Sequence, residues 1–140
     1  MKHRLFLGVF LAFFMLILAA CGGSTTSSGA QEVQVSLSEY KVASSVTTFT
    51  PGTTYHFFVT NNGKTAHEFM LMPEGMNMGN MPMSDLHRQA FMMIDTVAPG
   101  ETKNIDYTFT SSLAGQNLEF ACHFAGHYEA GMKLPVTISK

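Results

Sequence analysis

Apolar and polar residues alternate along most of the chain that follows residue 31. Val33, Val35 and Leu37 are separated by single polar residues, and this period of two predicts a half-buried strand. The same signal recurs in short runs bounded by glycine, proline or asparagine: 46–49, 55–60, 66–72, 105–109, 118–122 and 134–139. Six to eight short strands with turns between them predict an all-β fold, an antiparallel Greek-key β-sandwich or barrel.

Residues 84–93 interrupt the alternation. Ser84 is expected to cap a short helix there, with Leu86 and Ala90 on its inner face. We therefore expect one short helix or an irregular methionine-rich insert within the β fold.

The first twenty residues do not fit the alternating pattern. Lys2 and Arg4 give a basic start, and residues 5–20 form an apolar run, as in a secretory signal peptide. The run is shorter than the roughly 20 apolar residues of a spanning helix, although a retained membrane anchor is the alternative.

The end of this run, Leu18-Ala19-Ala20-Cys21, resembles the lipobox of bacterial lipoproteins. The resemblance implies cleavage before Cys21, attachment of lipid to it, and a location on the outer side of the bacterial cell membrane. Residues 21–31 are rich in glycine and serine and predict a flexible tether. The expected organisation is a signal peptide (1–20), a lipid-anchored tether (21–31) and one folded domain (32–140).

Charge narrows the range of partners. Removal of residues 1–20 would lower the basic residues from eight to six against ten acidic residues, a net charge near −4 with histidine neutral. The sequence has no basic patch, so we expect no nucleic-acid partner. If Cys21 carries lipid, Cys122 is the one remaining thiol, and a lone thiol in an exported chain must be buried, reactive or bound to something.

Residues 121–132, ACHFAGHYEAGM, carry Cys122, His127 and Met132 at equal spacings, and His67 lies far upstream after a turn. Taken singly, Cys122 could be a small buried residue, His67 could bond to backbone, and Met132 could fill the core. Together, two imidazoles, a thiolate and a weak thioether are the ligand set of a blue-copper electron-transfer centre. Zinc is the competing metal, but a thioether offers it little.

With these residues, the segment NNGKTAHEF, the turn APGET and the final strand GMKLPVTIS, the domain resembles the cupredoxins. The resemblance implies one type 1 copper ion per chain, held by His67, Cys122, His127 and Met132. It also implies an electron carrier that is not itself an enzyme. Its partner would be a redox protein such as a cytochrome or an oxidase, and we expect the carrier to be a monomer.

Two related functions are excluded. The trinuclear cluster of multicopper oxidases requires His-x-His pairs, which the chain lacks, and a binuclear centre requires a second cysteine in the loop. His123 is expected to point away from Cys122 by strand alternation, towards solvent or an interface, and not to be a ligand.

A group of methionines among Asn, Gly and Pro residues predicts an exposed loop with a possible secondary Cu(I) site, since soft thioethers favour Cu(I). Its members are Met76, Met78, Met81 and Met83. His87 could join this site, or the loop could instead dock a partner. The alternative function is therefore copper storage, delivery or resistance, and a third is a binding module that does not use the metal.

Overall fold

The structure, a computed structural model, describes residues 29–76 and 81–140. The predicted signal peptide, Cys21, most of the predicted tether and Met78 lie outside these residues. Within the described ranges, no helix combines the length and the apolar character needed to cross a membrane.

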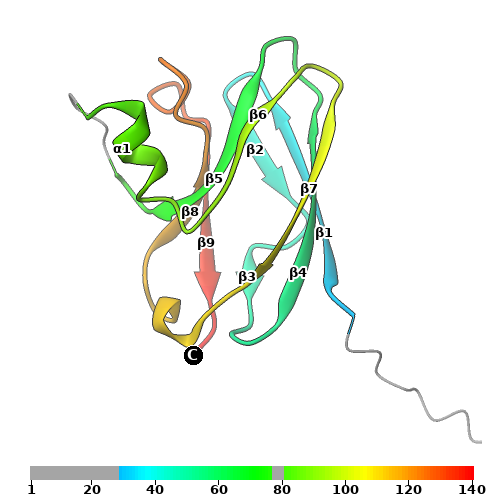
Figure 1. Cartoon of the computed structure of the whole chain (residues 1–140), viewed down its shortest axis with the longest axis vertical. Coiled ribbons are helices and arrows are strands. Elements are labelled where there is room, and N and C mark those ends of the chain that lie inside the picture. Colours follow the sequence, from blue (N-terminus) through cyan, green and yellow to red (C-terminus); the bar gives the residue numbers. More distant parts are fainter. Residues whose placement is uncertain (1–28, 77–80) are drawn as a thin grey trace, which may run out of the picture.

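The described strands form two sheets packed face to face (Figure 1). The first sheet has the order β2 (Lys41–Ser44), β1 (Gln31–Ser38), β4 (Thr54–Asn61), β7 (Thr102–Thr108). The second has the order β3 (Thr48–Phe49), β9 (Lys133–Ile138), β8 (Leu118–Ala121), β5 (His67–Pro73), β6 (Met92–Val97). The predicted all-β sandwich is confirmed. The sheets are mixed, however, because β1 pairs with β4 and β3 pairs with β9 in parallel.

Aromatic side chains fill the space between the sheets. Phe49 stacks on Phe109 with ring centroids 4.4 Å apart, and Phe69 lies 4.8 Å from Phe120. Phe57, from the first sheet, contacts rings from the second. Each of these side chains is fully buried. The apolar residues that alternate with polar ones in the sequence therefore form one continuous core.

Strand β5 is buried along both faces, unlike the half-buried strands of the first sheet. Its odd-numbered residues from His67 to Leu71 belong to the inner side, and Phe69 and Leu71 pack in the main core. Its even-numbered residues face outwards, where Met70 and Met72 pack with Leu86 of helix α1 (Met83–His87). Helix α1 lies on the side of this sheet away from the first sheet (Figure 1).

Two local predictions about the insert are corrected. Ser84 does not cap the helix, because α1 follows Pro82 and already includes Ser84. The helix ends at His87, and Met92 begins strand β6, which pairs with β5. Pairing with β5 and burial of alternate residues override the local preference for a longer helix. A short 3-10 helix, η1 (Ser111–Leu113), completes the described elements.

The methionine segment is also less exposed than the sequence predicts. Met76, Met81 and Met83 are partly buried and pack against the cluster of Met70, Met72 and Leu86. The described methionines therefore form a second, smaller core beneath α1, since flexible thioether side chains fill irregular space well.

Candidate metal centre

Three of the predicted ligands converge at one end of the sandwich. His67, Cys122 and His127 offer donor atoms that all lie within 4.8 Å of one another. The Nδ1 atoms of the two histidines are 3.3 Å apart, and Cys122 Sγ is 3.4 Å from Nδ1 of His127. The fold thus brings His67 to a loop that lies about sixty residues away in the sequence.

Backbone hydrogen bonds close the loop that carries the other ligands. The N–H of Cys122 donates to the carbonyl of Met132 (3.1 Å), and the N–H of Met132 donates to the carbonyl of His127 (3.0 Å). Gly126 and Gly131 have φ of 81° and 100°, the left-handed conformation that favours glycine. Met132 is fully buried and packs in the main core. The loop is therefore held in shape by its own backbone.

A buried asparagine holds the turn before His67. The Nδ2 of Asn61 donates to the carbonyls of Thr65 (2.8 Å) and Val97 (2.9 Å), and its Oδ1 accepts from the N–H of Gly63 (2.8 Å). A β-carbon at Gly63 would lie 3.0 Å from His67 Nε2, so the close approach requires glycine. Asn61 therefore braces the turn that precedes His67.

Burial sets the protonation of the cluster in the metal-free protein. It raises the pKa of the Cys122 thiol to about 11, with a smaller effect from the nearby Glu68 carboxylate. Burial also lowers the pKa of His67, as does the charge of His127. The imidazole of His67 is therefore neutral at neutral pH, whereas a metal must displace the thiol proton.

The donor set fits a soft or borderline metal. The Nε2 of His67 is buried without a hydrogen-bond partner among the described residues, and the N–H of Glu68 points to Cys122 Sγ at 3.5 Å. A backbone N–H directed at sulfur stabilises a thiolate. Two imidazoles and a thiolate in a largely buried site suit copper, and the fully buried Met132 ends the same loop.

One residue beside this cluster was not anticipated from the sequence. Tyr40, in the turn between β1 and β2, places its ring edge against the His127 ring with centroids 5.7 Å apart. It is 53% exposed and has a φ of 59°. Its neighbour Glu39 accepts hydrogen bonds from the N–H groups of Lys64 and Thr65, which ties this turn to the segment before His67.

The prediction for His123 is half correct. Its side chain lies on the face opposite Cys122, where Tyr128 stacks on its ring with centroids 4.4 Å apart. That face is covered, so His123 is 1% exposed and does not reach solvent. Burial lowers its pKa, which keeps the imidazole neutral.

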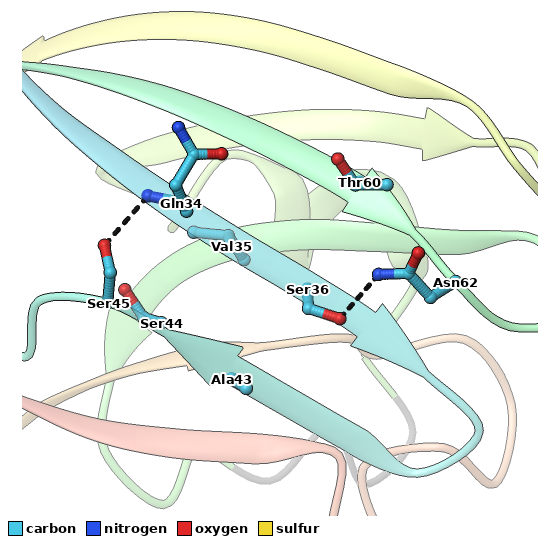
Figure 2. A pocket seen from close by; sticks show the side chains of 8 residues that line it. All are labelled: Gln34, Val35, Ser36, Ala43, Ser44, Ser45, Thr60 and Asn62. Atoms are coloured by element: carbon cyan, nitrogen blue, oxygen red, sulfur yellow. Dashed lines mark hydrogen bonds between the residues drawn. The ribbon is translucent and has the colours of Figure 1, made fainter.

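A shallow surface cavity of about 370 Å³ lies on the first sheet and includes none of the predicted ligands (Figure 2). Small polar residues line it, including Ser36 of β1, Ser44 of β2 and Asn62, which follows β4. The side chain of Asn62 donates to Ser36 Oγ there. We assign no ligand to this cavity.

Comparison of the whole fold with solved structures shows that the domain has the cupredoxin fold. A dithionite-reduced auracyanin from Roseiflexus castenholzii has a TM-score of 0.61 and 18% identity, covering 80% of this chain and 100% of that one. Auracyanin B has a TM-score of 0.61 and 19% identity, covering 79% and 90%. An azurin from Methylomonas sp. strain J has a TM-score of 0.58 and 12% identity, covering 80% and 100%.

Among curated sequences, the copper-resistant cuproprotein CopI of Vibrio cholerae serotype O1 is 33% identical over 88 residues. The match covers 61% of this chain and 50% of CopI, so the chain spans about half the length of this relative. No family model matches the chain.

Proposed function

We propose that the protein carries single electrons on one copper ion held by His67, Cys122, His127 and Met132. The observation that carries the proposal is the convergence of two imidazole nitrogens and one thiol sulfur in a buried, preformed site. The cupredoxin fold and the name of the relative CopI both favour copper over zinc.

The residues of the site have distinct roles in this proposal. Cys122 would supply a thiolate that binds both Cu(I) and Cu(II), and His67 and His127 would hold the same ion through their ring nitrogens. Met132 tunes the reduction potential as a weak ligand. The bound copper would accept one electron from a reduced partner protein and pass it to an oxidised acceptor.

The contact with that partner is proposed to lie around His127. Its ring is flanked by the partly buried Phe124, at 6.0 Å between centroids, and by the exposed Tyr40. An apolar rim around a ligand histidine allows a redox protein such as a cytochrome or an oxidase to approach closely. We propose a monomeric carrier without enzymatic activity, exported by its first twenty residues and anchored through lipid on Cys21 to the outer side of a bacterial membrane.

The test is a spectrum of the full chain with one equivalent of Cu(II), beside Cys122→Ser. We expect an intense visible thiolate-to-copper band and narrow copper hyperfine splitting by EPR in the wild type only. His56→Ala is the control, because His56 is a partly exposed histidine of the first sheet that pairs with Asp106 of the same sheet. A colourless wild type, or a band that survives in Cys122→Ser, would overturn the proposal.

Copper resistance or delivery is the second candidate, favoured by the similarity to the copper-resistant cuproprotein CopI and by the methionine cluster under α1. In that case Cu(I) binding should depend on the methionines of the insert. Replacing Met76, Met78, Met81 and Met83 by Ser would weaken Cu(I) binding at least tenfold without changing the visible band. A carrier would instead show fast electron self-exchange and an unchanged Cu(I) affinity.

A further inference from the structure

A second group of metal-binding side chains lies on the outer face of the β5–β6 sheet. Glu68, His87 and Asp95 offer donor atoms that all lie within 4.8 Å of one another. Glu68 comes from β5, His87 from the end of α1, and Asp95 from β6. The Nε2 of His87 is 3.1 Å from Oε2 of Glu68. These three residues are called the outer cluster below.

The carboxylate of Glu68 is held in place and presented to the cluster. Its Oε1 accepts a hydrogen bond of 2.7 Å from the backbone N–H of His123, and its Oε2 faces His87. The side chain is fully buried, in a strand whose residues after it are all apolar. A buried carboxylate is unfavourable unless a positive charge compensates it, and a metal ion supplies such a charge.

The residue whose backbone binds Glu68, His123, is itself a buried histidine. The register of β5 and β8 pairs Met70 with Ala121, and continuing it places His123 opposite Glu68 on the same face. Both ring nitrogens of His123 are buried without a hydrogen-bond partner among residues 29–76 and 81–140. Buried polar atoms normally find partners, so unpartnered ring nitrogens on the face that carries Glu68 favour a ligand on that face.

The donor types select the metal. One imidazole with two carboxylates suits a divalent ion of the borderline class and suits Cu(I) poorly, since Cu(I) prefers sulfur. Among these divalent ions, a site of nitrogen and oxygen donors binds Cu(II) more tightly than Zn(II). Asp95 is exposed and His87 is half-buried, so an ion can enter from solvent although Glu68 lies inside.

We propose that Glu68, His87 and Asp95 form a second, divalent metal site that binds Cu(II) most tightly. It lies back to back with the predicted copper centre, because His67 and Glu68 are consecutive residues whose side chains point to opposite faces of β5. The two sites also touch, since the N–H of Glu68 points to Cys122 Sγ. The proposal does not require that the inner centre transfers electrons.

The test is a Cu(II) titration of the full chain, read by bound copper per chain and by EPR. We compare the wild type with His87→Ala and with His56→Ala. The second variant removes a histidine that also faces a carboxylate, but on the first sheet. His87→Ala should bind one Cu(II) fewer than the wild type and keep the visible band, whereas His56→Ala should bind as many as the wild type. Cys122→Ser should lose the band and keep the equivalent that depends on His87, with wide hyperfine splitting.

Asp95→Asn provides a variant that does not endanger folding, because the side chain is exposed. It should raise the Kd of the His87-dependent equivalent at least tenfold, with an unchanged thermal unfolding midpoint. Equal copper content and equal Kd in the wild type, His87→Ala and Asp95→Asn would overturn the proposal. The wild type could be colourless and still bind the copper equivalent that depends on His87. This result would overturn the proposed electron carrier and support the outer site.

Discussion

The two faces of strand β5 carry different chemistry on consecutive residues. The inner face brings His67 to Cys122 and His127, beside a core of aromatic rings. The outer face carries Glu68, with His87 and Asp95, beside a core of thioethers. Because successive side chains of a strand point to opposite sides, a one-residue step along β5 separates a nitrogen and sulfur site from a nitrogen and oxygen site.

This comparison shows how a strand buried on both faces extends what a small sandwich can hold. The first sheet leaves one side partly open to solvent, so only its inner side chains are fixed in a core. Helix α1 closes the outer side of β5, and a polar residue there must find partners in place of water. Glu68 finds His87 and the backbone of His123.

The largest expected effect is on the inner face. Phe69→Ala removes a fully buried ring that contacts Phe57 and Phe120, and should lower the free energy of unfolding by about 3–5 kcal/mol. Urea unfolding of the metal-free protein measures the loss. Phe69→Leu, the control, should lose less than Phe69→Ala, because it leaves a smaller cavity. A loss below about 1 kcal/mol for Phe69→Ala would show that the inner core repacks freely.

The next residue tests the outer face. Met70→Ala removes a fully buried thioether under α1 and should cost about 2–3 kcal/mol, because the flexible methionines around it partly fill the space. The same urea experiment applies, with Met70→Leu expected to cost less than about 1.5 kcal/mol. The visible band of the copper-loaded variant should persist. A loss as large as that of Phe69→Ala would mean that the two faces form one cooperative core.

A third prediction concerns pH and the buried carboxylate. Burial raises the pKa of Glu68 above 4.5 in the folded state. As pH rises above about 4.5, the unfolded chain releases this proton first, so the contribution of Glu68 should lower the stability of the metal-free wild type until the pH passes the folded pKa.

Glu68→Gln removes this titration. The stability of the variant relative to the wild type should therefore rise between pH 4.5 and neutral pH, as followed by thermal unfolding in the presence of a chelator. Parallel pH profiles for the two proteins would contradict a raised pKa. With Cu(II) present at neutral pH, the wild type should be more stable than Glu68→Gln, because only the wild type keeps the outer carboxylate.

The smallest effect is expected on the first sheet. His56 pairs with Asp106, and the Asp106 side chain is 62% exposed, so water screens their attraction. His56→Ala should change the free energy of unfolding by less than about 1 kcal/mol in the same urea experiment. A larger loss would show that this pair contributes more than a surface pair usually does. Comparison with His87→Ala then isolates what burial adds to a histidine–carboxylate contact.

Much of the fold could be predicted from alternation. The runs around Val35, Phe57 and Phe120 became β1, β4 and β8, because each has one side chain in two facing the core. Strand β6 could not be predicted in this way, since Met92, Met93 and Ile94 are apolar in sequence and suit a helix equally well. Pairing with β5 decides the matter.

The exposed faces were predicted less well than the core. His123 was expected to lie near solvent because of strand alternation, and the methionines because turn-forming residues surround them in the sequence. Composition does not show whether another element covers a face. In this domain the short helix α1 covers Met70 and Met72, and the ring of Tyr128 stacks on His123.

The sequence by itself determined the loop with Cys122, His127 and Met132, since its spacing and its two glycines act over a few residues of backbone. Only the tertiary structure decided that His67 meets this loop, and that Glu68, His87 and Asp95 meet one another. Spacing constrains atoms only over short stretches of chain, whereas strand register and the covering helix fix which distant side chains share a face.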